Sequence, residues 1–241
     1  MTNLEQIYEN NTSLTNCINL ASSLPDAGGG GDNGGSLMDL YQYGIWSSSE
    51  ITSLPNDFCR GWLYIKELDF PNATVAGSYI CYNGTRLESV NLPKCTRIGD
   101  YSFYNCTSLQ TINCPNINTI GESLFRDCSS LTELVFLEAT SIGTYGVRAC
   151  TSLTRADFSK LATIGNNAFL ESSALVTLII RTDSVCKMNN VNSLLSTPIA
   201  EGTGYVYVPA SLLEDYKSAS NWSTYAAQIR AIEDYPEITG G

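Results

Sequence analysis

Apolar residues recur at a fixed period through the middle of the chain. Six consecutive segments, with no gap between them, begin at Ile65, Leu87, Leu109, Leu131, Leu153 and Leu175, which is a 22-residue repeat. In each segment the first, fourth and sixth positions are apolar, which gives the pattern L-x-x-L-x-L with alternation at its centre. Such alternation is typical of a short β-strand with one buried side. The repeat therefore predicts one short strand in every copy.

A glycine stands at the same position in five successive segments. These glycines are Gly77, Gly99, Gly121, Gly143 and Gly165. Glycine is required where the backbone takes a positive φ or where another backbone comes very close. The sequence leaves both reasons open and predicts that the chain turns its first corner at each glycine.

A second set of apolar positions lies further along each segment. It consists of Cys81, Phe103, Phe125, Val147 and Phe169, and Cys106, Cys128 and Cys150 follow three residues later in the middle segments. A single copy of so short a repeat cannot bury its own apolar side. Stacking at about 4.8 Å, the spacing of strands, aligns equal positions into one continuous core. The sequence therefore predicts a solenoid.

The repeat resembles the BspA-type leucine-rich repeats of host-associated bacteria. The resemblance rests on L-x-x-[LVI]-x-[LF]-x(5)-I-G with a downstream F-x-x-C-[TS]-S, and the clearest copies span residues 87–108 and 109–130. Ordinary leucine-rich repeats carry Asn or Cys at the ninth position and an apolar residue at the eleventh. Here the apolar residue stands at the twelfth position, as in the BspA subtype. The resemblance implies an α/β repeat solenoid, a right-handed leucine-rich-repeat coil with a short-stranded parallel sheet and a C-terminal strand-helix cap.

The chain divides into five regions. They are an N-terminal helical arm (1–24), a Gly-rich linker (25–37), an N-terminal capping coil (38–64), BspA-type leucine-rich repeats (65–196) and a C-terminal cap (197–241). In the capping coil, Leu54 falls in the isoleucine position that precedes the glycine. In the C-terminal cap we expect one strand from Tyr205, followed by a helix that covers the end of the solenoid. The apolar side of that helix would hold Leu212, Leu213, Tyr216, Trp222, Tyr225 and Ile229.

The arm and the linker each allow two interpretations. Leu4, Ile7, Leu14 and Ile18 fit a heptad, which predicts a homo-oligomer through residues 1–24. The alternative is a single short helix, which docks on the first coil or remains separate. The GGGGDN run within the linker is like one copy of a calcium-binding nonapeptide, but no tandem copies follow, which favours a linker.

The chain contains no histidine, and this excludes Ser-His-Asp triads, Cys-His dyads and imidazole metal sites. Nine cysteines occur without a C-x-x-C pair. Stacking would bring Cys106, Cys128 and Cys150 close enough for a disulfide or a metal ladder, but three in a row cannot all pair, and small buried thiols explain them better. We predict buried, reduced thiols, no catalytic residues, no metal and no cofactor. The chain is therefore not expected to be an enzyme.

The net charge of the chain restricts the classes of partner that it is expected to bind. Lys and Arg number 13 against 24 Asp and Glu, a net charge of −11, which repels nucleic acid and anionic lipid surfaces. The start MTNLEQIYENNTSL is unlike a secretory signal, and no apolar run is long enough to span a membrane. We expect no nucleic-acid partner and no membrane insertion. The localisation stays unknown, with a virion or the cytoplasm favoured over secretion.

The outward positions of the predicted strands form the candidate binding face. On the concave side of the sheet these are Glu67, Asp69, Ser89, Asn91, Thr111, Asn113, Glu133, Arg155, Asp157 and Thr177. Val135 and Ile179 share the same side. Solenoids use such faces to bind partners. The alternative is a solvated sheet with binding elsewhere.

These features predict a non-catalytic recognition or adhesion scaffold. Its partner would be a protein or glycan on a cell surface or virion, and relatives at cell surfaces together with the missing export signal suggest a bacteriophage virion component, in a tail or on the particle surface. One alternative is a structural subunit that assembles with copies of itself. Another is a bacterial cell-surface protein exported by an unseen route.

Overall fold

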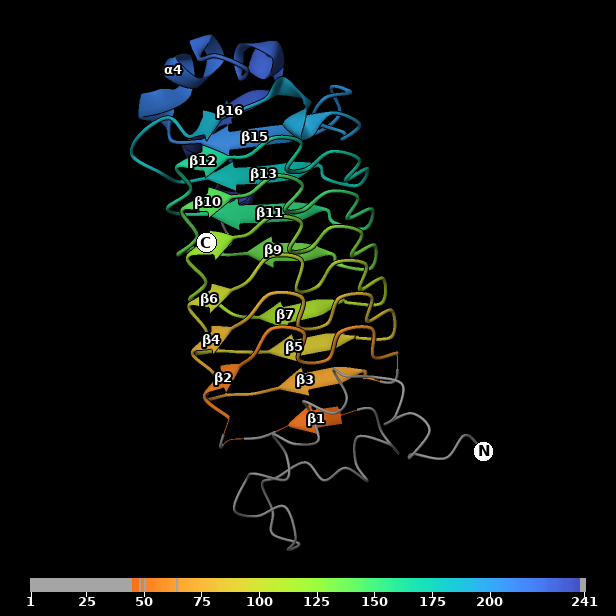
Figure 1. Ribbon diagram of the computed structural model, residues 1–241. Coiled ribbons are helices and arrows are strands. Elements are labelled where there is room, and N and C mark those ends of the chain that lie inside the picture. The colour runs from red at the N-terminus through yellow and green to blue at the C-terminus, as the bar shows by residue number, and fades with distance from the viewer. Residues whose placement is uncertain (1–44, 48, 50, 64, 239–241) are drawn as a thin grey trace, which may run out of the picture.

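The protein is a solenoid whose strands stack one coil above the next (Figure 1). A computed structural model describes residues 45–47, 49, 51–63 and 65–238. The predicted arm at 1–24 and the predicted linker at 25–37 lie outside these residues. The start of the predicted capping coil lies outside them as well.

Two stacks of parallel strands form two sides of the solenoid. One side carries β1 (Ile45–Ser47), β3 (Glu67–Asp69), β5 (Ser89–Asn91), β7 (Thr111–Asn113), β9 (Glu133–Val135), β11 (Arg155–Phe158), β13 (Thr177–Ile180), β15 (Tyr205–Val208) and β16 (Ile229–Ala231). The other side carries β2 (Ser53–Leu54), β4 (Val75–Ala76), β6 (Arg97–Ile98), β8 (Thr119–Ile120), β10 (Ser141–Ile142), β12 (Thr163–Ile164) and β14 (Lys187–Met188). Equal positions of successive repeats pair, so that Leu68 lies opposite Val90. The predicted parallel repeat solenoid is confirmed.

The apolar positions of the repeat meet inside the coils. The first, fourth and sixth positions are buried in nearly every repeat, and Ile112, the exception, is half-buried. Phe103 and Phe125 stack with ring centroids 5.8 Å apart. One core cluster therefore runs the length of the described solenoid, as stacking of equal positions requires.

Turns complete the coils between residues 65 and 174. Two positions in every turn have positive φ, and almost none is glycine; the first set is Tyr79, Tyr101, Ser123, Tyr145 and Asn167, and the second is Asn83, Asn105, Asp127, Ala149 and Glu171. Backbone amides in these turns donate to the next coil, as from Tyr79 N to Asp100 O (3.0 Å) and from Cys81 N to Ser102 O (2.8 Å). The left-handed residues thus let successive turns join by hydrogen bonds.

The glycines at the repeated position are explained by a close backbone approach and not by a positive φ. A Cβ on Gly99 would lie 2.5 Å from Ser78 N and 2.6 Å from Gly77 C. Each glycine therefore allows a close approach of the preceding coil. The left-handed corner comes two residues later.

The sixth coil is longer than the repeat period. Thr163 pairs with Lys187 and Thr177 pairs with Tyr205, and the added chain includes the 3₁₀ turn η1 (Val191–Leu194). Met188 consequently takes the position opposite Ile164, which strict periodicity would give to Cys186. The predicted boundary at residue 196 falls inside this longer coil. Backbone groups of Cys186 instead bond to the C-terminal cap, to the Tyr216 hydroxyl (2.9 Å) and Trp222 Nε1 (2.6 Å).

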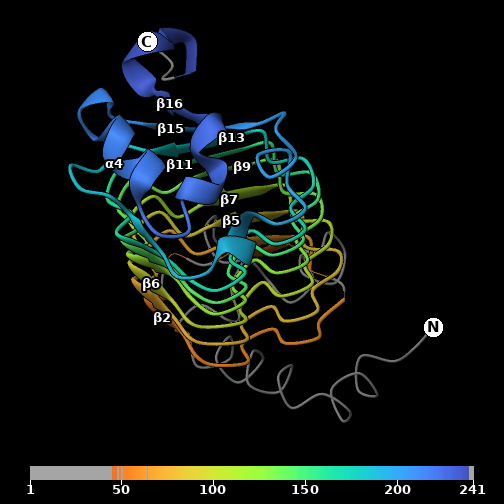
Figure 2. The same ribbon diagram turned by 90° about the horizontal axis from the view of Figure 1, so that it is seen from above.

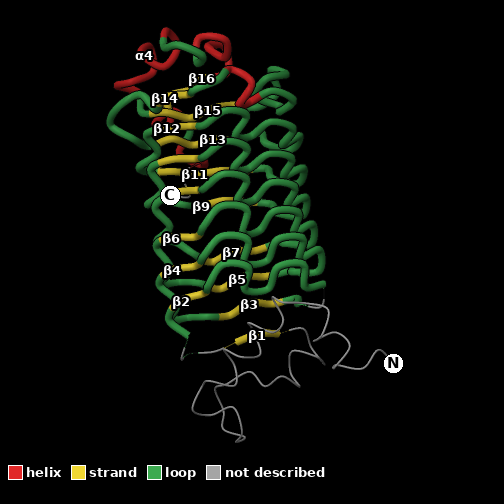
Figure 3. Tube along the Cα trace, viewed as in Figure 1, coloured by secondary structure: helices red, strands yellow, loops and turns green. Residues whose placement is uncertain are grey.

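The C-terminal cap contains the predicted strand and a shorter helix than expected. After β15 come η2 (Ala210–Leu212), α4 (Leu213–Ser218), η3 (Ser223–Gln228), β16, η4 (Ile232–Asp234) and η5 (Pro236–Ile238). The elements η2, α4 and η3 gather at this end of the solenoid (Figure 3). The helix α4 ends because Ala219 is extended, and Ile229 lies on β16 rather than on the predicted helix. Tyr216 and Trp222 are fully buried and close the end of the core. Within the described residues, no helix has the length and apolar character of a membrane span.

Candidate binding surface

The outward side of the strands β3 to β15 is called the strand face below. Its first three strands carry a ladder of hydrogen-bonded side chains, in which Asn91 Nδ2 donates to Asp69 Oδ1 (2.7 Å) and Asn113 Nδ2 donates to Asn91 Oδ1 (2.6 Å). The inward neighbours Leu68 and Val90 are buried, so alternation along the strand turns the ladder outward. Each amide keeps one further N–H for a partner. The strands β3, β5, β7 and β9 are called the open half of the strand face. This half presents a strip of polar side chains that hydrogen bonds hold in place.

The other predicted residues of the open half lie beside this ladder. Glu67 and Ser89 are half-buried, and Thr111 is exposed. On the next strand Glu133 is exposed, and so is Val135, which has no amide to extend the ladder. The structure therefore brings the predicted residues of β3, β5 and β7 together on one accessible surface.

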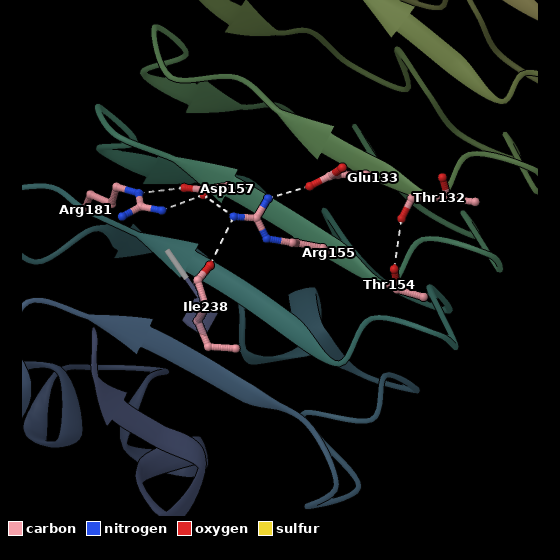
Figure 4. Close-up of polar contacts among 7 residues, drawn as sticks. All are labelled: Thr132, Glu133, Thr154, Arg155, Asp157, Arg181 and Ile238. Carbon is pink, nitrogen blue, oxygen red and sulfur yellow. Dashed lines mark hydrogen bonds and ion pairs between the residues drawn. The ribbon is translucent and has the colours of Figure 1, made fainter. Parts of the chain in front are cut away.

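The predicted residues of β11 are engaged within the protein. Arg155 Nη2 lies 2.7 Å from Asp157 Oδ2, and Arg181 binds the same carboxylate through two hydrogen bonds of 2.9 and 2.7 Å (Figure 4). Arg155 also pairs with Glu133. The hydrogen bond to Asp157 raises the pKa of Arg181. Asp157 is only 3% exposed, so its charge is balanced internally and not presented to solvent.

The strands β11, β13 and β15 are called the closed half of the strand face. A segment after β16 packs on this half. Ile232 packs with Ile179 and Tyr207 in a small apolar cluster that also includes Tyr235 and Ile238. Ile179 is fully buried although it occupies an outward strand position. The Ile238 carbonyl accepts a hydrogen bond from Arg155 at 3.4 Å. Burial raises the pKa of Tyr207.

The view along the solenoid shows how this cover arises. The chain after β16 leaves the end of the solenoid beside the strands β13 and β15 (Figure 2). Thr177, the last predicted residue, is half-buried and pairs with Tyr205 on β15. At the fifth repeat position, the outward residues Asp157 and Ile179 are therefore buried, whereas Asn91 is half-buried and Asn113 is exposed.

The cysteine positions are buried, as predicted. The thiols of Cys106, Cys128 and Cys150 donate to the carbonyls of Cys81, Phe103 and Phe125 at 3.1–3.2 Å. Ser172 takes the same place one coil later, and its hydroxyl donates to Val147 O at 2.8 Å. Burial raises the pKa of each of these three thiols.

The raised pKa values keep these thiols protonated near neutral pH, so they are poor nucleophiles. Their role is to fill the core and satisfy carbonyls. Among the residues described, no group of three or more Cys, Asp or Glu is placed to hold a metal ion.

Sequence reasoning missed a second surface, on the turns. Tyr79 stacks on Tyr101, and Tyr82 stacks on Tyr104, each pair one coil apart. The signal was present as tyrosines at the repeat spacing. It was obscured because neither tyrosine position is apolar throughout the repeats.

A family model for the BspA type leucine rich repeat region matches residues 74–191 in six copies. Residues 74–191 belong to the BspA-type leucine-rich repeat family. The match falls on the coils whose paired strands and buried columns are described above. It includes the departures from ordinary leucine-rich repeats at the ninth and twelfth positions.

Comparison with solved structures finds similar folds. The pneumococcal vaccine antigen PcpA is 13% identical with a TM-score of 0.53 over 77% of this chain and 44% of its own. A leucine rich cell surface protein of Faecalibacterium prausnitzii is 23% identical (TM-score 0.42; 58% and 44% covered), and a leucine-rich repeat protein of Bacteroides ovatus is 14% identical (TM-score 0.33; 73% and 65% covered). The chain thus spans less than half the length of the first two. Comparison with curated protein sequences finds no significant match.

Proposed function

We propose that this BspA-type repeat protein is a non-catalytic recognition or adhesion scaffold, and that the open half of the strand face binds its partner. The ladder of Asp69, Asn91 and Asn113 carries the proposal. Its donors and acceptors are held in place before binding, which lowers the entropy cost of ordering them on a partner. Amides and carboxylates in a row suit the hydroxyls of a glycan or the backbone groups of a protein.

The setting of this binding is a further part of the proposal. We place the partner, a protein or glycan, on a cell surface or virion, with a bacteriophage tail or surface component as one carrier of the scaffold. The Gly-rich stretch at 25–37 supports this because such a composition suits a flexible tether between the repeats and a larger particle. The net charge of −11 disfavours nucleic acid and anionic membranes as partners.

A glycan microarray and an array of purified extracellular proteins, probed with the labelled full chain, test the proposal. The variant carrying Asn91→Ala and Asn113→Ala removes the ladder while leaving the buried positions untouched. Thr96→Ala with Thr119→Ala is the matched control, because both threonines are exposed and lie away from the strand face. We expect at least one ligand whose affinity falls about tenfold in the ladder variant alone. Absence of any ligand, or equal binding by a folded ladder variant, contradicts the proposal.

A further inference from the structure

A stack of tyrosines and arginines runs along the turn side of the coils. Ring centroids of Tyr79 and Tyr101 are 5.2 Å apart at an interplanar angle of 4°, and those of Tyr82 and Tyr104 are 4.8 Å apart at 8°. All four rings are half-buried. The Tyr–Arg ladder is defined here as Arg60, Tyr79, Tyr82, Tyr101, Tyr104, Arg126, Tyr145 and Arg148.

Guanidinium groups cover ring faces along this ladder. Arg60 lies 4.9 Å from the Tyr79 centroid and 5.2 Å from that of Tyr82, and Arg126 lies 5.2 Å from that of Tyr104 and 5.4 Å from that of Tyr145. Ring faces are thereby covered by one another and by cations. Few ring faces remain free for a sugar to stack on, so the Tyr–Arg ladder favours a protein partner. Tyr and Arg are also the side chains that dominate binding energy in protein interfaces.

The arginines of the Tyr–Arg ladder differ in their carboxylate partners. Arg148 donates to Glu171 through Nε (3.0 Å) and Nη2 (2.8 Å), a pairing that raises the pKa of Arg148. Arg60 donates to Asp57 at 2.9 Å. One coil before Glu171, the equivalent position is Ala149, so Arg126 has no carboxylate where Arg148 has one.

Two buried polar atoms without a hydrogen bond lie in the turn of Arg126. Its Nε makes none and lies 3.4 Å from Asp127 Oδ2 as an ion pair. Ser123 Oγ likewise makes none of good geometry, although it lies near enough to the Tyr101 hydroxyl to lower the pKa of that phenol slightly. The larger effect on Tyr101 is its hydrogen bond to Glu122, which raises the pKa to about 12. Ser123 is fully buried, but the Arg126 side chain is 27% exposed, so its guanidinium can still donate to a partner.

We propose that the guanidinium of Arg126 binds a carboxylate side chain, Asp or Glu, of a partner protein, with Tyr104 and Tyr145 flanking it. That carboxylate accepts hydrogen bonds from Arg126, as Glu171 does from Arg148. An arginine held between aromatic rings is ordered before binding, and a charge-assisted hydrogen bond to it is strong. The site goes beyond the proposed function because it lies on the turns and not on the strand face.

Selection of random dodecapeptides displayed on phage against the full chain tests the proposal. We expect enriched peptides with an essential Asp or Glu, whose replacement by Asn or Gln weakens binding about tenfold. Ala149→Glu supplies an internal carboxylate to Arg126 and should weaken the same peptides by a similar factor. It should fold, since Ala149 (φ 56°) shares its left-handed backbone with Glu171 (φ 65°). Ala162→Glu is the control, because it adds the same charge at an exposed site outside the turns.

Arg126→Gln provides a second variant that removes the guanidinium without adding charge, and it should give the same loss. Peptides that lack an acidic residue, or that bind Ala149→Glu and wild-type protein equally, overturn the proposal. Failure to enrich any peptide overturns it as well. Peptides lost only in the Asn91→Ala, Asn113→Ala variant also overturn it, yet they support the strand face, so the two proposals fail separately.

Discussion

The two halves of the strand face occupy the same repeat positions and have opposite environments. Asn91 and Asn113 lie at an outward position that remains accessible, whereas Asp157 and Ile179, at the same position in later coils, are buried. In the later coils Arg155 and Arg181 bind the Asp157 carboxylate. Residues 232–238, which lie outside the repeats, pack on Ile179 and Tyr207. A repeat pattern therefore fixes the direction of a side chain but not its accessibility.

The halves also satisfy their polar groups differently. The open half uses neutral amides and one carboxylate at hydrogen-bond distance, with solvent available to each group. In the closed half the buried Asp157 carboxylate needs two arginines, because an unpaired charge cannot be taken from water at acceptable cost. The comparison predicts that equivalent substitutions in the two halves will have unequal effects.

Asp157→Ala should have the largest effect. It leaves Arg155 and Arg181 without their shared carboxylate beneath the covering segment, and we expect a loss of about 3 kcal/mol in the free energy of unfolding. Asn113→Ala, at the same repeat position in the open half, should cost under about 1 kcal/mol. Urea unfolding measures both. Equal losses would show that the closed half is not closed in solution.

The core should behave alike beneath both halves. Gly99→Ala places a Cβ against the backbone of the preceding coil, and we expect a loss of about 2 kcal/mol with one cooperative transition. Gly121→Ala should cost less, because its Cβ would meet the Asp100 carboxylate, at 2.3 Å, which can rotate away. Circular dichroism at increasing urea measures both variants. Two separate transitions would contradict a shared core.

Sequence alone could predict the strands and the core, because period-2 alternation inside a fixed repeat leaves one solution for the inward positions. Leu68 and Val90 illustrate this, since they pair and are buried as expected. The cause of the repeated glycines stayed open because positive φ and close approach both select glycine. The left-handed positions could not be found, since Tyr101 and Ala149 are unusual residues for that conformation.

Two parts of the candidate site depended on contacts between distant segments. The covering of Ile179 by Ile232 joins residues far apart in the chain, and no periodicity encodes it. The longer sixth coil also breaks the period at the place where Cys186 bonds to the cap. Sequence reasoning could therefore place Asp157 on the strand face but could not foresee that it is buried.

A smaller effect is expected from the buried thiols of Cys106, Cys128 and Cys150, which lie in the coils of β5, β7 and β9. Burial raises the folded-state pKa of Cys128, so stability is fully present below the ordinary thiol pKa of about 8.5 and declines as pH rises above it. At pH about 9.5 this thiol should account for about 1 kcal/mol of lost stability. Cys128→Ser removes that dependence and keeps the bond seen at Ser172. Identical pH profiles of variant and wild type would contradict the burial of this thiol.

The most direct test of the difference between the halves is the labelling rate of engineered cysteines. Val135→Cys and Ile179→Cys are placed separately in a Cys17→Ser background, where the described native thiols are buried and slow to react. Maleimide should label residue 135 rapidly and residue 179 at least about a hundredfold more slowly. Removal of residues 232–241 should make the two rates similar. Rapid labelling of residue 179 in the full-length, folded protein would contradict the account.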